Sequence, residues 1–183
     1  MMNKVQFSLA TLKELPEILE VIKDARAFLK LQNSGQWQDG TPSEQTIKRD
    51  IEAKQFYVAK LDNQVIGVLA LLNHEVAYDH LLTGSWDHQT PYKVIHRFAV
   101  LRPYTKQGVA SYMLDACENL AKQDNIHLIR VDTHEKNIPM TKLLLKKGYL
   151  IKGTTLIEGT KLRTVFEKYL RDHSWKYPIS FAS

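Results

Sequence analysis

The stretch HRFAVLRPYTKQGVA, residues 96–110, joins an apolar strand to an amphipathic helix through a short basic turn. A proline interrupts the apolar run after Val100, and helical periodicity begins near Gly108. The first N–H groups of a helix have no partner within the helix, and they carry a partial positive charge that suits a phosphate group. Glycine at such a turn also lets a ligand approach the backbone closely. This stretch therefore predicts an α/β fold with an anion-binding turn where the helix begins.

Hydrophobic periodicity along the rest of the chain predicts the order β-α-α-β-β-β-α-β-α-β-β, which corresponds to a mixed sheet with helices on both faces. Strands are expected at residues 5–9, 55–61, 64–72, 92–101, 126–134, 149–155 and 164–170. Helices are expected at residues 12–32, 43–51, 106–125 and 138–148. Asp62 and Asn63 are typical of a hairpin turn, and residues 73–91 predict a strand end followed by a long loop.

The length of 183 residues suits a single domain. We predict one domain over residues 1–183, with its core at about 5–170 and a C-terminal tail at 171–183. Hydrophobic residues make up 44% of the chain and charged residues 25%, proportions that argue against a disordered protein. The net charge of +5 is scattered without a run of like charges, so we expect no nucleic-acid partner.

The sequence also bears on the compartment. No apolar run reaches the roughly 18 residues that a membrane span needs, and Lys and Glu interrupt the N-terminal segment. The only cysteine, Cys117, has no partner for an internal disulfide and lies on the apolar side of a predicted helix. We therefore expect a cytoplasmic protein with no membrane partner, in which Cys117 packs in the core. A homodimer is left open.

Two segments resemble the coenzyme-A binding motifs of the GNAT N-acetyltransferases. The first, FAVLRPYTKQGVASYMLDA, is similar to a strand ending in AV, a proline, and then Q/R-x-x-G-x-G/A at the start of a helix. Pro103, Gly108 and Ala110 match this pattern, and Thr105 stands where the family usually has Gln or Arg. The resemblance extends over nearly the whole chain, to about Leu170, and is strongest to uncharacterised bacterial members.

The second segment, NIPMTKLLLKKGY, resembles the family pattern N-x-x-A-x-x-L-Y-x-x-x-G-F. Its matching positions are Asn137, Leu143, Gly148 and Tyr149. Met140 replaces the alanine, and Leu144 stands where the family has the tyrosine that acts as general acid. The resemblance thus implies a coenzyme site but leaves the general acid without a candidate.

The resemblance implies a mostly antiparallel central sheet of about seven strands, splayed between the fourth and fifth strands. It implies acetyl-CoA as the cofactor, with the pantetheine arm along the open strand edge and the pyrophosphate on the turn. The activity implied is acetyl transfer to a primary amine of a small molecule or peptide, by direct attack in a ternary complex. The positions that these roles assign to the cofactor are Phe98, Ala99, Val100, Thr105, Lys106, Gln107, Gly108, Val109, Ala110, Ser111 and Asn137.

Acetyl transfer to an amine needs a general base, because an ammonium group has no lone pair. Histidine suits this task near neutral pH. His96 lies two residues before Phe98, so strand alternation places both side chains on one face. Glu75, at the end of the preceding strand, is the second candidate. The alternatives are a histidine that only packs or bonds a carbonyl group and a solvated carboxylate, and Arg97 is expected to face away and pair with a carboxylate.

The acceptor site is predicted on the first two helices and the loop that connects them. Trp37 and Trp86 are expected as an aromatic wall, with His134 near the cleft as a further substrate-binding residue. No spacing of histidines typical of metal ligands occurs, and we expect no metal. The alternative function is a non-catalytic acyl-CoA-binding or sensor protein with the same fold, because Leu144 replaces the tyrosine.

Overall fold

The structure, a computed structural model, describes residues 5–171. Its strands and α-helices are β1 (Gln6–Leu9), α1 (Leu15–Leu31), α2 (Glu44–Glu52), β2 (Phe56–Leu61), β3 (Gln64–Leu72), β4 (Thr83–Gly84), β5 (Lys93–Val100), α3 (Val109–Gln123), β6 (Leu128–Thr133), α4 (Ile138–Lys146), β7 (Leu150–Ile157) and β8 (Lys161–Tyr169). Short 3₁₀ turns are η2 (Leu12–Glu14), η3 (Val76–Tyr78) and η4 (Arg102–Tyr104). The seven predicted strands and four predicted helices are confirmed. The predicted tail, apart from Arg171, lies outside the described residues.

The sheet has eight strands in the order β1-β2-β3-β5-β6-β8-β7-β4. The eighth strand is β4, a two-residue segment within the long loop of residues 73–91 that pairs with β7. Periodicity cannot reveal a strand of two residues, because it holds too few side chains to alternate. Every neighbouring pair is antiparallel except β5 and β6, which run parallel.

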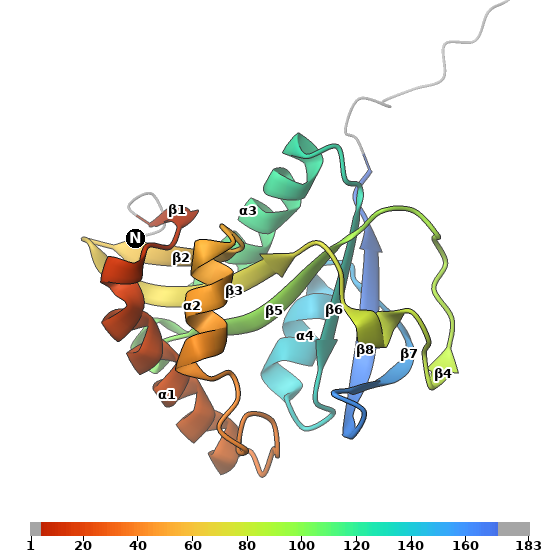
Figure 1. The fold of residues 1–183 in the computed structure, drawn as a ribbon, viewed down its shortest axis with the longest axis horizontal. Coiled ribbons are helices and arrows are strands. Elements are labelled where there is room, and N and C mark those ends of the chain that lie inside the picture. The colour runs from red at the N-terminus through yellow and green to blue at the C-terminus, as the bar shows by residue number, and fades with distance from the viewer. Residues whose placement is uncertain (1–4, 172–183) are drawn as a thin grey trace, which may run out of the picture.

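The sheet opens between β5 and β6. Their pairing ends at Ile95 and Val131, and beyond this point the two strands diverge (Figure 1). A bulge in β5 contributes to the divergence: Ala70 pairs with His96 and Val68 with Ala99, so two residues of β5 face one of β3. Such a bulge bends a strand and increases its twist. The predicted splay between the fourth and fifth long strands is confirmed.

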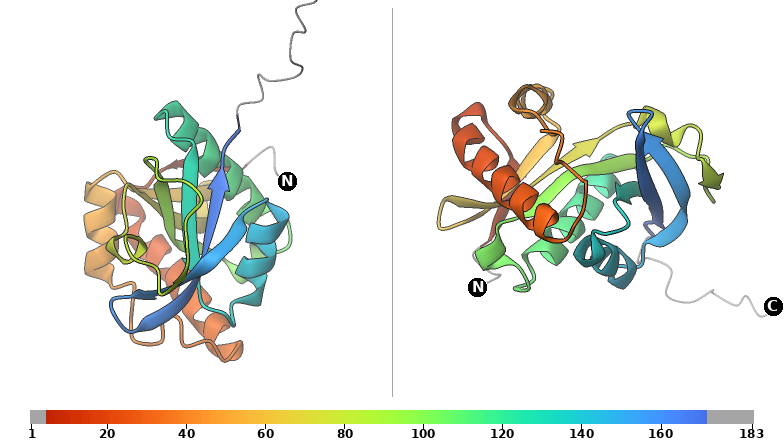
Figure 2. Two further views of the ribbon diagram at one scale, coloured as in Figure 1. Left: turned by 90° about the vertical axis from the view of Figure 1, so that its right-hand side faces the viewer. Right: turned by 90° about the horizontal axis from the view of Figure 1, so that it is seen from below.

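Helices cover both faces of the sheet, with α1 and α2 on one side and α3 and α4 on the other (Figure 2). The α1 and α2 face packs a core on β2 and β3 that includes Ile18, Ile47 and Phe56, each 0% exposed. The opposite core includes Met113 and Leu114 of α3, both 0% exposed. The apolar stripe predicted for α3 is confirmed. A packed layer of helices therefore covers each face of the sheet.

Local sequence accounts for several element boundaries. Asp62 and Asn63 both adopt positive φ angles, 49° and 69°, as a tight hairpin with the twist of its strands requires. The Glu14 carboxylate accepts a hydrogen bond of 2.7 Å from the Thr11 N–H at the start of η2. Leu12, in the predicted helix of residues 12–32, is 48% exposed and lies in η2 before α1 begins. No helix in residues 5–171 is long and apolar enough to cross a membrane.

Candidate active site

The turn before α3 exposes its backbone. Residues 105–108 are all solvent-exposed, and Lys106 and Gly108 adopt left-handed conformations, with φ angles of 59° and 88°. Side chains fold back onto the preceding segment: the Thr105 hydroxyl donates to the Arg102 carbonyl and the Gln107 amide donates to the Pro103 carbonyl. Alternating conformations of this kind aim successive N–H groups at one point and suit an anion. The turn and the first residues of α3 are thus built for a phosphate group.

A cavity of about 190 Å³ lies where the sheet opens. Its walls come from β5, β6, the α1–α2 loop, the segment after β3, the start of α4 and the β7–β8 hairpin. Trp37, Glu75, His96, Phe98 and Asn137 are the predicted site residues that line it. We call this cavity the cleft.

His96 lies in the cleft between two carboxylates. Its Nε2 atom is 3.2 Å from Glu75 Oε2, and its Nδ1 atom is 3.6 Å from Asp132 Oδ1. The Nε2 atom is buried and makes no directed hydrogen bond, so its contact with Glu75 is an ion pair when the ring is protonated. Glu75 Oε1 is held separately by the Ala77 N–H at 3.1 Å. The His96 ring is therefore held with a carboxylate beside each of its two nitrogens.

Contact with His96 is the main cause that lowers the pKa of Glu75 from its ordinary value. Desolvation by burial opposes this shift, and the hydrogen bond from Ala77 adds to it. A carboxylate with a lowered pKa is a weaker base. The two candidates are therefore adjacent but chemically unequal, because the lowered pKa makes Glu75 a poor proton acceptor near neutral pH.

Asp132 and Tyr78 both contact the His96 ring and hold it in position. The fully buried Tyr78 hydroxyl donates a 2.7 Å hydrogen bond to Asp132 Oδ1, and its ring stacks on the His96 ring at a centroid distance of 6.2 Å. Burial and the neighbouring carboxylate raise the pKa of Tyr78 well above its ordinary value. Tyr78 is thus a hydrogen-bond donor that stays protonated. No sequence pattern pointed to this role, because residues 73–91 show no periodicity.

Arg97 occupies the bulge and points to the other side of β5, as expected. Its φ angle is 54°, and its Nε atom lies 3.0 Å from Asp50 Oδ2 of α2. Burial raises the pKa of Asp50 and lowers the pKa of Arg97. The predicted pairing of Arg97 with a carboxylate is confirmed, and the pair ties α2 to the bulge.

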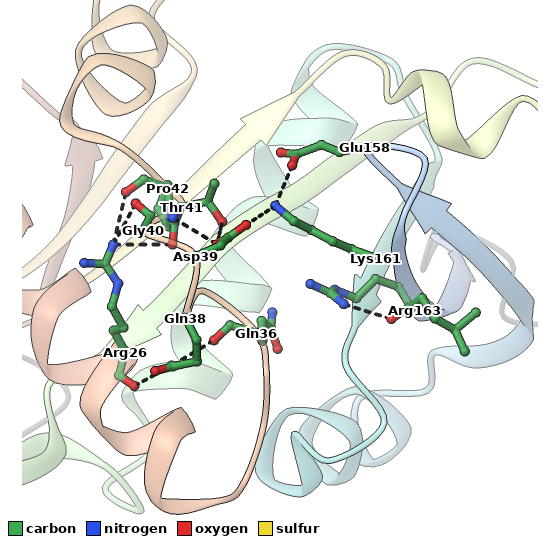
Figure 3. A network of polar contacts seen from close by, with 11 residues as sticks. Arg26, Gln36, Gln38, Asp39, Gly40, Thr41, Pro42, Glu158, Lys161 and Arg163 are labelled. Atoms are coloured by element: carbon green, nitrogen blue, oxygen red, sulfur yellow. Dashed lines mark hydrogen bonds and ion pairs between the residues drawn. The ribbon is translucent and has the colours of Figure 1, made fainter.

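An ion-pair cluster joins the two outer walls of the cleft (Figure 3). Lys161 Nζ, at the start of β8, lies 2.5 Å from both Asp39 Oδ2 in the α1–α2 loop and Glu158 Oε2 in the β7–β8 turn. Asp39 also accepts hydrogen bonds from the Thr41 N–H and hydroxyl. These contacts with Lys161 and Thr41 lower the pKa of Asp39.

Two of the predicted acceptor residues do not line the cleft. Trp86 packs on Tyr78, and the Arg130 guanidinium stacks on its ring at 4.0 Å. His134 accepts a hydrogen bond from the Lys136 N–H in the turn before α4, and burial lowers its pKa. Local pattern cannot tell an aromatic anchor from a cleft wall, so the substrate-binding role of both residues stays a prediction.

The start of α4 contributes Asn137. Its Oδ1 atom accepts from the Met140 N–H and its Nδ2 atom donates to Gln36 Oε1, both at 3.3 Å. Leu144, on the same helix, is 0% exposed and belongs to the core. Cys117 is also 0% exposed, and burial raises its thiol pKa, which confirms a core role.

The residues present fit a coenzyme A molecule. The β5 edge facing β6 is unpaired beyond Ile95, so the main chain at the predicted positions Phe98, Ala99 and Val100 is open to an extended ligand on that side. The exposed turn at Thr105, Lys106, Gln107 and Gly108 leads into the first turn of α3. The first α3 residues are the predicted positions Val109, Ala110 and Ser111. An open strand edge that leads to an anion-binding turn matches a thioester arm ending in a pyrophosphate.

Comparison with known proteins gives one family. The family model of the acetyltransferase (GNAT) family matches residues 22–149. A GNAT-family acetyltransferase from Streptococcus agalactiae 2603 is 30% identical, with a TM-score of 0.83, over 92% of this chain and 96% of its own. A search among curated proteins finds no match.

Two further solved structures share the fold at lower identity. A putative acetyltransferase from Staphylococcus aureus MU50 is 20% identical, with a TM-score of 0.70, over 91% of this chain and 99% of its own. The PaiA N-acetyltransferase from Thermoplasma acidophilum, solved in complex with coenzyme A, is 17% identical, with a TM-score of 0.71, over 90% and 98%. The opening between β5 and β6 therefore lies within a fold common to these proteins.

Proposed function

The chain belongs to the acetyltransferase (GNAT) family, and we propose that it transfers the acetyl group of acetyl-CoA to a primary amine of a small molecule or peptide. Acetyl-CoA, the cofactor of this family, supplies an acetyl group activated as a thioester. The observation that carries the proposal is the His96–Glu75 pair, in a cleft at the opening of the sheet. Nucleophile activation is the step that such a pair serves.

We assign His96 as the general base and Glu75 as the carboxylate that stabilises its protonated form. An amine in the cleft loses a proton to the imidazole of His96, directly or through one water. Glu75 at 3.2 Å and Asp132 at 3.6 Å then flank the imidazolium. This assignment follows the pKa direction, because a lowered pKa makes Glu75 the poorer proton acceptor.

The β5 bulge has two proposed roles. A bulged residue lies outside the regular ladder, so a backbone N–H at Arg97 or Phe98 is available to donate to an oxygen that gains negative charge. The bulge also turns the β5 edge away from β6, which leaves room for the pantetheine arm. Main-chain groups of Phe98 and Val100 are proposed to bond that arm, with the pyrophosphate on residues 105–111 and Asn137 on the opposite side.

One observation favours a second candidate function. The residue at the position of the family's acidic tyrosine is Leu144, which is fully buried and has no proton to give. A protein that binds acyl-CoA as a sensor, without transferring the group, needs no such acid.

Two measurements on the purified protein separate the candidates. Thermal-shift titration with coenzyme A measures binding, and release of free thiol from acetyl-CoA over a panel of amines measures transfer. The proposed function predicts stabilisation by coenzyme A and amine-dependent thiol release. Stabilisation without release for any amine supports the sensor, and failure to bind coenzyme A contradicts both candidates.

A further inference from the structure

Arg163 in β8 is a buried cation with unused hydrogen-bond donors in the cleft. It is 8% exposed and lines the cavity. A guanidinium group has five N–H donors, and the side chain makes one hydrogen bond, from Nη1 to the Leu162 carbonyl at 2.8 Å. Its Nε atom lies 3.7 Å from Asp132 Oδ2, which is too long for a hydrogen bond. Most of its donors therefore have no protein partner within residues 5–171.

Burial makes this arrangement costly for the protein alone. Desolvation lowers the pKa of Arg163, although the Asp132 carboxylate partly offsets the effect. A buried charged group normally gains its full set of hydrogen bonds, because an unmade bond costs free energy. In Figure 3 the guanidinium points from β8 toward the α1–α2 loop, with Gln36 and Asp39 beyond it. The donors are thus directed into the space that an acceptor would occupy.

The other cations of the cleft are already engaged. Lys161 contacts both Asp39 and Glu158 at 2.5 Å, and Arg97 is paired with the buried Asp50 at 3.0 Å. Arg163 differs because its carboxylate neighbour, Asp132, lies 3.7 Å away, beyond hydrogen-bond distance. Among the described residues that line the cleft, Arg163 is therefore the cation best placed to bind an added anion.

The cleft also contains a row of alternating charge. Contacts of 3.2, 3.6 and 3.7 Å link Glu75 to His96, His96 to Asp132, and Asp132 to Arg163 in turn. The Glu75 and His96 end suits an amine, which is charged before its proton is removed. The Arg163 end suits a carboxylate, which a guanidinium group binds through two parallel hydrogen bonds.

We propose that the acceptor is an amino acid or a similar small zwitterion, whose amine meets His96 and Glu75 while its carboxylate binds Arg163. This inference rests on the proposed acetyl transfer and names the substrate class of the same site. Arg163 would then select acceptors by their carboxylate, because a molecule that lacks this group leaves buried donors unpaired.

The test compares matched pairs of amines by thiol release from acetyl-CoA. The acids are glycine, β-alanine, 4-aminobutanoate and L-leucine, and each is compared with its primary carboxamide. The series varies the separation of amine and carboxylate. The amides have less basic amines, so more of each is neutral at a given pH, which biases the comparison against the expected result. We expect at least one acid to exceed its amide in kcat/KM by roughly 10-fold or more.

Variants connect that preference to Arg163. In R163Q we expect kcat/KM for the preferred acid to fall roughly 10- to 100-fold, with a change below about threefold for its amide. Arg49→Gln is the matched control, because Arg49 is exposed, lies next to Asp50 on α2 and does not line the cleft. Arg163→Lys keeps the charge without the planar fork, and we expect it to retain part of the preference. If R163Q does not fold, the acid preference of R163K is compared with that of the wild type instead.

Binding gives a readout that is independent of turnover. With saturating coenzyme A, the preferred acid should raise the melting temperature of the wild type and of R49Q, but not of R163Q. The proposal of a zwitterionic acceptor would be overturned if the amides are transferred as well as the acids, or if the acid preference survives in R163Q. Both results leave the proposed acetyl transfer standing. Transfer only to amines without a carboxylate would also overturn the proposal of a zwitterionic acceptor. No transfer to any amine would overturn the proposed function, and this inference with it.

Discussion

The turn before α3 and the cleft differ in the groups that they offer to their proposed ligands. The turn, residues 105–108, is exposed and offers backbone N–H groups shaped by two left-handed residues, Lys106 and Gly108. The cleft offers side chains that are largely buried, and its charged groups come from separate strands and loops. The two regions lie apart in the fold: the turn precedes α3, and the cleft lies where β5 and β6 part.

This difference implies different sensitivities to mutation. Backbone recognition depends on conformation, so most substitutions in the turn are tolerated unless they change φ. Recognition by buried, paired side chains depends on each partner, because loss of one leaves another uncompensated. Substitutions in the cleft should therefore have the larger effects, and those in the turn should act mainly on coenzyme affinity.

The largest effect is expected from His96→Ala. Removal of a general base lowers kcat by roughly 10²- to 10⁴-fold, and the neutral limb of the pH–rate profile should flatten. Coenzyme A affinity, measured by titration, should stay close to the wild type. His74→Ala is the control, because His74 pairs with Asp79 at the surface outside the cleft. An unchanged pH–rate profile in the His96 variant would eliminate His96 as the base.

A smaller loss is expected from Glu75→Gln, with kcat lower by about tenfold, because an imidazolium loses a neighbouring carboxylate. The folded protein lowers the pKa of Glu75, so its contribution to stability is present above the ordinary pKa of about 4.3 and is lost as pH falls through the folded value. The melting temperatures of wild type and variant should therefore converge on acidification. Asp79→Asn, in the exposed pair, provides the comparison; an equal effect of both variants would contradict a special role for Glu75.

Gly108→Ala tests the turn. Alanine at a φ of 88° costs about 1–2 kcal/mol, and we expect the Kd for coenzyme A to rise by about tenfold while kcat at saturation changes little. Gly148→Ala is matched, because Gly148 has a φ of 82° and open space around it at the end of α4. If both variants lose coenzyme affinity equally, general destabilisation explains the loss and the turn has no special role.

The smallest effect is expected from Asp39→Asn, which breaks the contact with Lys161 across the outer walls. Asp39 is 43% exposed at its side chain, so the pair should contribute at most about 1 kcal/mol to the free energy of unfolding. Chemical denaturation should show that difference shrinking in 1 M salt, which screens exposed charges. A difference that persists in high salt would indicate a buried, unscreened interaction and would weaken the contrast with the cleft.

The strands and helices could be predicted from the sequence more fully than the contacts among the site residues. Periodicity located the long strands and helices because one face of each is buried, as the α3 residues Met113 and Cys117 illustrate. His96 and Glu75 could be nominated as candidates, but not as contacting partners. The packing of Trp86 on Tyr78 and Arg130 could not be predicted, because these residues lie far away in sequence or in a segment without periodicity.

The sequence by itself determined the long strands, the helices and the glycine turn before α3, because each leaves a pattern in residues close in the chain. Only the tertiary structure decided which side chains meet in the cleft. Glu75, His96, Asp132 and Arg163 come from the segment after β3 and from β5, β6 and β8, and they meet because β5 bulges and parts from β6. This meeting determines their chemistry: it places a carboxylate beside each ring nitrogen of His96, and it brings Arg163, with donors that make no hydrogen bond within residues 5–171, to the wall of the cleft.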